Sequence, residues 1–577
     1  MSVSVRSGLR TFLGLVIVGA VAAPTLARAA LGGTQPGGLA GGAPMASPEG
    51  CKSCHGGVLA TAPGDDQDPG HPFMAWDTWA GSMMANAARD PLFLASVTLA
   101  EQDRPGSGTY CLRCHTPSAF VESRATPGNG ANLSDIDREG VHCAVCHRSV
   151  DASKPPTSDA NAPYVGNAQL VFDLGESTEA TYRGPRDDAW STPAHQIVQD
   201  PFVGDDSRLC GQCHQVENPD ENLHDASGKD LGRPFPLDTT YEEWLHSSFS
   251  SGASARSCAG CHMPVEHGVH QIATGALERS DPARHDFAGG NEWGPAMLKA
   301  AFPGLRDAEY DRARAATQAS LRAAATVELR ALPSSGPSGG EVALTVRVTN
   351  LTGHKLPTGY ADGRRVWLEI AVIDVAGHAD VQSGAYDVST AELHDDSQLR
   401  IYEAVHGRDG APSDHIVLHR QILKDSRIPP RGFQATTATA PVGSLTFSDG
   451  VGGFLNYDDA SFRVKLPAAT SGAVTVRARL MFQAVTSHHV AALMAENTTD
   501  TRGSALMALW QQTGKAAPFV MAETAQVIEV KAAVIDDTPP DVSGTGCGCS
   551  ITEGRHEMPA ALAFGALLAL RRRRRVF

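Results

Sequence analysis

Five copies of the pattern Cys-x-x-Cys-His constrain this chain of 577 residues more than any other feature. Together they use ten of the twelve cysteines. The pattern is typical of covalent c-type haem attachment, in which two thiols bond to the macrocycle and the next imidazole binds the iron. Zinc ribbons repeat Cys-x-x-Cys pairs at short, regular spacing, and neither zinc nor a disulfide explains the histidine that follows each pair.

The motifs predict five haem c groups and two sets of residues that hold them. The cysteines expected to form the thioether bonds are Cys51, Cys54, Cys111, Cys114, Cys143, Cys146, Cys210, Cys213, Cys258 and Cys261. The expected proximal iron ligands are His55, His115, His147, His214 and His262.

The second axial ligand of each iron decides its chemistry, because His or Met gives electron transfer and an open position permits catalysis. The candidate distal ligands are His71, His142, His195, His267, His270, His285 and His354. Met83 and Met84 are sulfur candidates, with helix packing as the favoured explanation. Surface or hydrogen-bonded roles are expected for His378, His394, His406, His415, His419, His488 and His489.

His354 stands apart from the other candidates because it lies far beyond the last motif. Gly353, Pro357 and Gly359 constrain the backbone around this one imidazole. We expect it to reach back to a haem from a loop between two strands, with a structural role as the alternative.

The start of the chain is predicted to be a secretion signal over residues 1–29. Arg6 and Arg10 precede an apolar run that is shorter than the about 20 residues of a membrane span. Export fits the motifs, because covalent haem attachment takes place outside the bacterial cytoplasm.

The end of the chain is predicted to carry a second targeting signal. Residues 534–557 form a linker with Cys547 and Cys549, and residues 558–577 combine a short apolar segment with five consecutive arginines. This arrangement resembles the C-terminal sorting tails of myxobacterial surface proteins, which implies anchoring in the envelope. A disulfide or an unstructured end is the competing interpretation.

The body of the chain is predicted to be α+β and multidomain. A flexible linker at 30–49 precedes an irregular, haem-packed and mostly helix-and-loop pentahaem domain at 50–290. A helical connector at 291–325 leads to a β-sandwich-like domain at 326–533, where apolar residues recur with period two. The individual expectations for helices are 73–87 stopped by Pro91, 307–325, 488–497, and 504–513 ended by Gly514. The expected strands are 342–348, 366–372, a hairpin of 462–466 and 474–480, and 527–530.

The haem motifs with their flanking residues resemble the cytochrome c-554 family, whose typical member is the tetrahaem acceptor of hydroxylamine oxidation. The matching stretches are Trp-x-x-Ser-Met-Met-Ala, Cys-Leu-Arg-Cys-His-Thr-Pro and Gly-Val-His-Cys-Ala-Val-Cys-His. The loop Gly-His-x-x-Pro-Thr-Gly resembles that of the family's larger relatives, which append a β domain. The resemblance implies stacked haem pairs and mostly bis-His ligation. This chain has five motifs instead of four, so the family's ligand assignment does not transfer haem by haem.

Two functions remain open, and the first is favoured. One is an exported, envelope-anchored electron carrier that works with redox partner proteins and contacts the membrane through its tail. The other is an oxidoreductase that acts on a small nitrogen or sulfur compound at one haem with an open site. A docking role for the β domain is a third, weaker interpretation. The formal charge of −16 argues against nucleic-acid binding.

Overall fold

The computed structural model describes residues 45–57, 73–151, 165–172, 181–186, 195–275, 278–468 and 472–532. All of the described residues fall in one compact unit. The predicted signal peptide, His71, and the predicted tail with Cys547 and Cys549 lie outside the described residues. Within the described ranges, no helix is long and apolar enough to cross a membrane.

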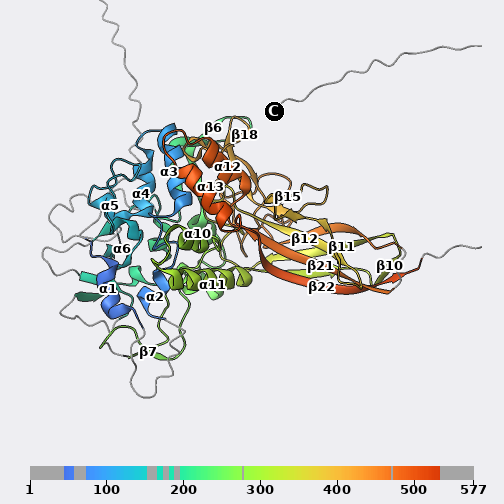
Figure 1. Cartoon of the computed structure of the whole chain (residues 1–577), viewed down its shortest axis with the longest axis horizontal. Helices are drawn as coiled ribbons and strands as arrows, with labels where there is room; N and C mark the ends of the chain where they lie inside the picture. The colour runs from blue at the N-terminus through green and yellow to red at the C-terminus, as the bar shows by residue number, and fades with distance from the viewer. Residues whose placement is uncertain are drawn as a thin grey trace, which may run out of the picture. The chain divides into compact units, whose positions relative to one another are not determined.

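Up to residue 290 the described chain consists of short helices and small sheets (Figure 1). The helices are α1 Pro48–His55, α2 Ala75–Trp79, α3 Pro91–Asp103, α4 Ser107–His115, α5 Pro117–Val121, α6 Cys143–His147, α7 Ser207–Gly211, α8 Thr240–Leu245 and α9 Cys258–His262, with 3-10 turns η1 Asp137–Glu139, η2 Pro201–Val203 and η3 Gly252–Ser254. Each two-stranded sheet joins successive strands: β1 Ser149–Val150 with β2 Val171–Phe172, β3 Thr181–Gly184 with β4 Gln196–Gln199, β5 Val216–His224 with β6 Asp230–Asp238, and β7 Val269–Gln271 with β8 Glu278–Ser280.

Two helices and a strand-rich region follow. They comprise α10 Gly294–Ala301, α11 Asp307–Ala323, β9 Ala325–Ala331, β10 Ser335–Pro337, β11 Glu341–Asn350, β12 Arg365–Ile373, β13 Ala379–Ser383, β14 Tyr386–Asp387, β15 Glu392–Leu393, β16 Ile401–Tyr402, β17 Ala404–Arg408, β18 Ala411–Pro412, η4 Ile416–Leu418, β19 Gln421–Asp425, β20 Tyr457–Lys465, β21 Gly472–Gln483, α12 Ser487–Ala495, α13 Arg502–Gln512 and β22 Phe519–Lys531. The class is therefore α+β, as the sequence predicts.

Two sheets share one apolar core in the strand-rich region. One sheet has the order β10-β22-β21-β12-β13, with β16 beside β12, and the other has the order β20-β11-β9. Buried and exposed residues alternate along β20 and β11, because successive side chains of a strand point to opposite faces. Val346, Ile370 and Leu480 come from different strands and are all fully buried in this core.

The expected hairpin of residues 462–466 and 474–480 is wrong, although both strands exist. β20 pairs with β11, whereas β21 pairs with β12 and β22. The connection after Lys465 therefore carries the chain from one sheet to the other. Period-two alternation shows which face of a strand is buried but does not name its partner, so the sequence pattern could not exclude this crossing.

The expected helix over 73–87 is also wrong beyond Trp79. Asn86 donates from its side chain to the carbonyls of Ala80 and Ser82, which competes with helical hydrogen bonds. A Cβ atom on Gly81 would lie 2.0 Å from the carbonyl oxygen of Glu309, so α11 crosses closely here. Pro91, expected to stop the helix, instead begins α3 behind the capping side chain of Asp90.

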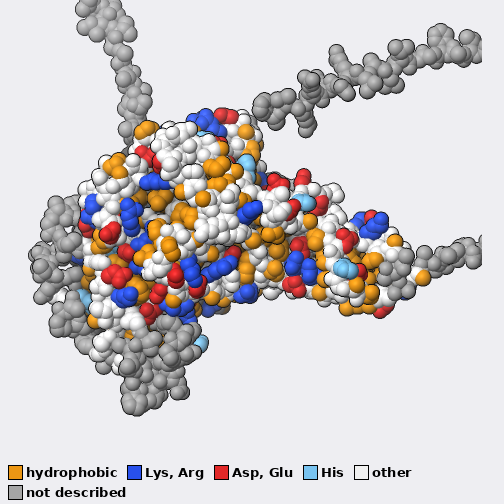
Figure 2. Space-filling model, in the orientation of Figure 1, with side chains coloured by type: hydrophobic (Ala, Val, Ile, Leu, Met, Phe, Trp, Pro, Cys, Tyr) orange, Lys and Arg blue, Asp and Glu red, His pale blue; other side chains and the backbone are white. Residues whose placement is uncertain are grey.

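Helices from both parts of the sequence form a second apolar cluster. Leu99 of α3 packs with Met297 of α10, Leu493 of α12 and Leu506 of α13, and all four are nearly or fully buried. Figure 1 shows α12 and α13 beside α3. The segment inserted before the last strand thus fastens the sandwich to the motif-bearing region. On the face in Figure 2, acidic and basic side chains are interspersed over both parts.

Candidate haem-binding cavity

Each Cys-x-x-Cys-His motif forms a helical turn, and this local structure explains why its three functional side chains converge. Residues i, i+3 and i+4 of a helix share one face. In α1, for example, Cys51, Cys54 and His55 therefore point to the same side. α4, α6 and α9 likewise end at the histidine of their motif. In the fourth motif helix α7 ends at Gly211, and a backbone hydrogen bond from His214 to Cys210 continues the turn.

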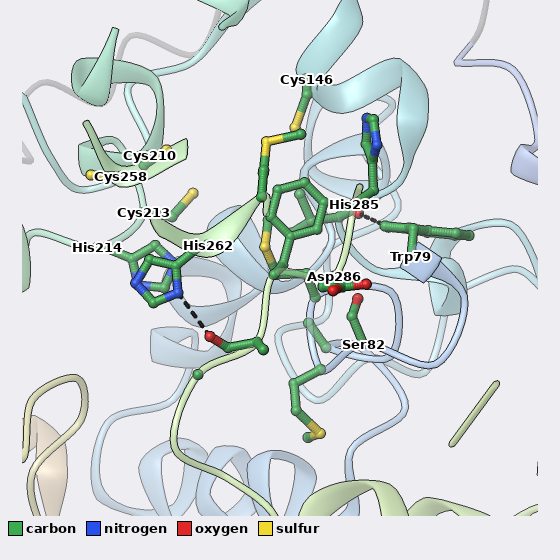
Figure 3. Close-up of a pocket in the computed structure, with 18 of the residues that line it drawn as sticks. Trp79, Ser82, Cys146, Cys210, Cys213, His214, Cys258, His262, His285 and Asp286 are labelled. Carbon is green, nitrogen blue, oxygen red and sulfur yellow. Dashed lines mark hydrogen bonds between the residues drawn. The ribbon is translucent and has the colours of Figure 1, made fainter. Parts of the chain in front are cut away.

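All five motifs open into one cavity of about 2770 Å³. Its lining includes every one of the ten motif cysteines and the five motif histidines. Figure 3 shows part of it, with Cys210, Cys213 and Cys258 grouped near His214 and His262. Protein interiors normally hold few voids larger than a water molecule, so a space of this size indicates a site for large ligands.

The order of the motifs in space differs from their order in sequence. The thiols of Cys51 and Cys143 hydrogen-bond to each other, which places the first motif beside the third. Cys114 contacts Cys213 in the same way. Figure 3 shows Cys210 close to Cys258, whose thiols also hydrogen-bond. The fourth motif is therefore the neighbour of both the second and the fifth.

Four of the five motif histidines are held by backbone carbonyls. Nδ1 of His55 lies 3.0 Å from the carbonyl oxygen of Ile272, and Nδ1 of His115 lies 3.1 Å from that of Ala87. Nδ1 of His147 lies 2.6 Å from the carbonyl oxygen of Arg183, and Nδ1 of His262 lies 2.8 Å from that of Ala288. A carbonyl can only accept, so Nδ1 carries the proton and Nε2 keeps its lone pair for a metal. His214 differs, because its ring is half exposed and its Nδ1 lies 3.9 Å from a carboxylate oxygen of Asp238.

Three motif histidines face a second imidazole across the cavity. The ring centroids are 6.4 Å apart for His55 and His195, with 17° between the ring planes. The corresponding values are 6.3 Å and 30° for His147 and His285, and 6.3 Å and 20° for His262 and His354. Two imidazoles bound to opposite sides of one metal ion, with metal–nitrogen bonds of about 2.0 Å, have centroids about 6.3 Å apart. The spacing therefore suits an iron between the rings of each pair.

His354 owes its position to a buried group of four charges beside it. Lys355 donates its backbone N–H to Glu243 of α8 and its ammonium group to Asp425. Arg427 contacts Glu243 at 3.1 Å and Asp425 at 2.8 Å, so the two positive and two negative charges balance. Such a cluster resists any displacement that would leave one buried charge unpaired.

The His354 ring is neutral and oriented. Its Nδ1 lies 3.0 Å from the carbonyl oxygen of Lys355. Burial lowers the pKa of His354 to about 4, and it lowers the pKa of His285 to about 3. Both rings therefore keep a free lone pair at neutral pH, which is the form that binds metal.

The other candidate distal ligands are less well placed. His142 lines the cavity, is 1% exposed, and has no hydrogen-bond partner on either ring nitrogen among the described residues. The side chain of His267 is 89% exposed and lies 3.5 Å from Asp281. His270 directs Nε2 to the carbonyl of His267 at 2.9 Å. His71 lies outside the described residues. The structure therefore brings His195, His285 and His354 to motif histidines and leaves His142 buried and unpaired.

One buried cluster was not predicted from the sequence. His406 and His419 are hydrogen-bonded, as expected, but both are buried around Asp362. The three residues lie in different segments and form no recognisable motif, so the sequence pattern did not join them.

The chain was compared with known proteins in three ways. A scan of family models and a search of curated proteins found no match. Among solved structures, a penta-haem cytochrome c552 from Thermochromatium tepidum aligns over 84% of this chain and 99% of its own length, with 18% identity and a TM-score of 0.47. An alkylpurine DNA glycosylase from Pseudomonas fluorescens covers 42% of this chain and 43% of its own, with 8% identity and a TM-score of 0.14. Neither likeness is close enough to establish a function for this chain.

Proposed function

We propose that this protein is an exported multihaem c-type cytochrome that transfers electrons through five covalently attached haems, most of them bis-His ligated. Haem iron would supply reversible one-electron chemistry. The chain's own residues would supply the thioether anchors, the axial imidazoles and the carbonyl groups that orient them. The observation that carries the proposal is the set of three facing histidine pairs, each with one member from a Cys-x-x-Cys-His motif.

The arrangement of the motifs supports a carrier. Cysteines bring the first motif beside the third and the fourth beside the second and the fifth, so groups attached within each set would lie close enough for electron transfer between them. Rigid axial ligands also suit this role, since they keep the iron in one coordination state during oxidation and reduction.

A second function, catalysis at an open haem, has one observation in its favour. For His115 and His214 the described residues offer no second imidazole in stacked contact. Phe93 instead stacks on the His115 ring at 3.5 Å, a contact that holds the ring without providing a ligand. A haem left without a sixth ligand could bind a small nitrogen or sulfur compound.

Export and anchoring are part of the proposal and rest on the sequence of the two ends. The secretion signal at 1–29 would deliver the chain to the compartment of haem attachment. The tail at 534–577 would hold it in the envelope, where redox proteins of the envelope are the expected partners. Deleting residues 546–577 should release the protein into the medium of its native host, and continued retention would contradict the anchoring.

Two measurements on the mature protein test the main proposal. Intact-mass spectrometry should find five haems, and three or fewer would overturn it. The ferric spectrum then separates the two functions, because five low-spin haems favour a carrier and one high-spin haem favours a catalytic site. Cyanide or nitrite titration of any high-spin haem would show whether a small ligand enters.

A further inference from the structure

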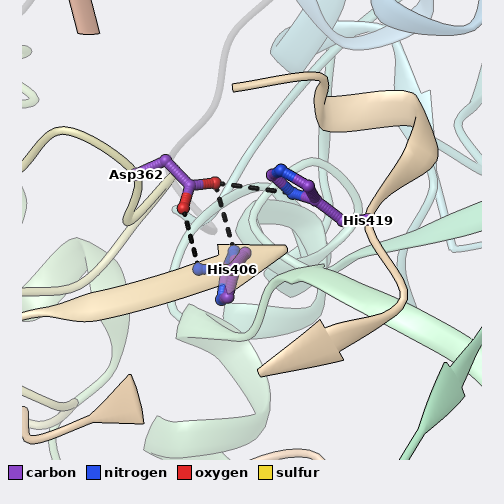
Figure 4. A group of neighbouring side chains, drawn as sticks. All are labelled: Asp362, His406 and His419. Carbon is purple, nitrogen blue, oxygen red and sulfur yellow. Dashed lines mark hydrogen bonds and ion pairs between the residues drawn. The ribbon is translucent and has the colours of Figure 1, made fainter. Parts of the chain in front are cut away.

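Three side chains from three segments of the β region meet at one buried point (Figure 4). Asp362 precedes β12, His406 lies in β17, and His419 lies between η4 and β19. His406 is 5% exposed and His419 is fully buried, while the Asp362 side chain is 8% exposed. Their ligand atoms all lie within 4.8 Å of one another.

The hydrogen bonds around His419 leave one nitrogen without a proton and without a donor. Its Nε2 lies 2.8 Å from the carbonyl oxygen of Ser413, which can only accept, so Nε2 carries the proton of the neutral ring. Nδ1 is then a bare lone pair, is buried, and has no hydrogen-bond partner among the described residues. The group in front of it is a carboxylate oxygen of Asp362 at 3.6 Å. Two acceptors therefore face each other with nothing positive between them.

His406 approaches the same carboxylate oxygen. Its Nδ1 lies 3.1 Å from Oδ2 of Asp362. The backbone N–H of His406 donates to the other oxygen of Asp362, at 3.4 Å, and so helps to fix the orientation of the carboxylate. One carboxylate oxygen and two imidazole nitrogens consequently converge on one point.

The separations match those of ligands that share a metal ion. A tetrahedral site with bonds of about 2.0 to 2.1 Å has ligand atoms about 3.3 Å apart. The measured 3.1 Å and 3.6 Å lie on either side of that value. Two imidazoles and one carboxylate are a donor set for zinc or ferrous iron.

The surroundings hold the ligands in place and leave a route to them. The buried ring of Phe235 packs edge-on against both imidazoles, with centroids 5.1 Å from His406 and 5.7 Å from His419. Asp362 also lines the large cavity, which gives an ion a path inward. The carbonyl of Ser413 plays the orienting part that backbone oxygens play behind metal-bound histidines.

We infer that Asp362, His406 and His419 form a binding site for one divalent transition-metal ion of the zinc or ferrous class, separate from the five haems. Three protein ligands leave at least one coordination position open, which is the ligand count of reactive zinc sites. Binding releases the proton of His406 Nδ1, since that nitrogen must offer a lone pair to the ion. The site does not depend on the proposed electron-transfer function.

Metal analysis of the full-length, haem-loaded protein tests the site. After equilibration with equimolar zinc and removal of free metal, we expect about one zinc ion per chain. Zinc K-edge absorption, which does not overlap the haem iron, should show imidazole nitrogen and carboxylate oxygen at about 2.0 to 2.1 Å. If the protein is isolated with iron in the site, total iron should exceed haem iron by about one per chain. A protein that holds neither ion at this stoichiometry would overturn the inference.

Matched variants locate the ion. Asp362→Asn and His419→Gln keep polarity and approximate size, and each should weaken zinc binding at least about 10-fold with five haems still attached. His378→Ala removes an exposed histidine near Asp374 in the same region and should leave zinc binding unchanged. Unchanged zinc content and an unchanged zinc spectrum in both ligand variants would show that the metal binds elsewhere and that the inference is wrong.

Discussion

The motif-bearing region and the β-sandwich are built on different principles. The sandwich has one continuous apolar core contributed by both of its sheets. In the described part of the chain before residue 290, the apolar clusters apart from the one shared with α10, α12 and α13 hold three to five buried residues each, around a cavity of about 2770 Å³. The first region is thus built around a cavity lined by the five motifs, whereas the second fills its own centre with side chains. We expect the first region to depend on haem for its stability and the second to be independent of it.

Removing the haems should produce the largest difference in stability between the two regions. In a haem-free chain, amides of residues 45–290 should lose at least about 2 kcal/mol of protection in hydrogen exchange, because the cavity then has no filling. Amides of β12 and β21 should keep their protection. Equal loss of protection in both regions would show that the sandwich also depends on haem.

The buried charges that join the two regions give the next largest effect. Asp425→Asn should lower the free energy of unfolding by about 3–5 kcal/mol at neutral pH, since it leaves buried Lys355 and Arg427 with one negative charge fewer. Asp459→Asn, which breaks an exposed pair with Arg347, should cost about 0–1 kcal/mol. Denaturant unfolding followed by circular dichroism measures both, and similar losses would remove the distinction.

The same charges set a pH dependence. Burial alone would raise the pKa of Asp425 and of Glu243, but the charges of Arg427 and Lys355 outweigh it and hold both values below the ordinary range. The unfolded chain therefore binds protons before the folded one does as the solution becomes acidic. Stability from this cluster is complete above the ordinary carboxyl pKa and falls as pH drops below it. In the variant Asp425→Asn, the free energy of unfolding should fall less steeply as the pH drops through this range.

A mutation that creates a cavity in the sandwich core tests whether this region is independent of the haem sites. Leu480 is fully buried, so Leu480→Ala should cost about 2–5 kcal/mol through lost burial and the void left behind. Val375 is 74% exposed, and Val375→Ala should change stability by less than about 0.5 kcal/mol. The haem spectrum of both variants should match the parent. A changed spectrum would mean that packing in the sandwich controls the haem sites.

The most local effect concerns His354, an imidazole of the β region that faces a motif histidine. His354→Ala should convert about one haem of five from low to high spin, because the iron at His262 loses its facing ligand. His267→Ala, at a largely exposed ring, should leave the ferric spectrum unchanged. An unchanged spectrum for His354→Ala would make the loop purely structural and direct attention to His142.

Elements with strong local patterns were predictable. α12 and α13 lie within a few residues of the predicted helices, and Gly514 adopts the positive φ of +80° expected after a helix end. The strands over 342–348, 366–372 and 474–480 were evident from alternation. The prediction of a helix over 73–87 was wrong because the Asn86 side chain bonds to the carbonyl of Ala80 and because Gly81 packs closely against α11.

The candidate site divides in the same way. The sequence shows which cysteines and histidines form each motif, because residues i, i+3 and i+4 share one face of a helix. The sequence does not show which second histidine faces each motif, because the loop of His354 is held beside His262 by tertiary contacts such as that of Lys355 with Glu243.

By itself, the sequence determined the five Cys-x-x-Cys-His motifs and the α+β class. Tertiary structure alone decided the crossing between sheets, the spatial order of the motifs, the facing histidines and the cluster of Asp362, His406 and His419. The physical reason is the separation along the sequence of the residues that interact. Helical turns and strand faces are set by neighbours a few residues away. Pairing across a cavity depends on packing between segments that are far apart in the sequence, such as those of His262 and His354.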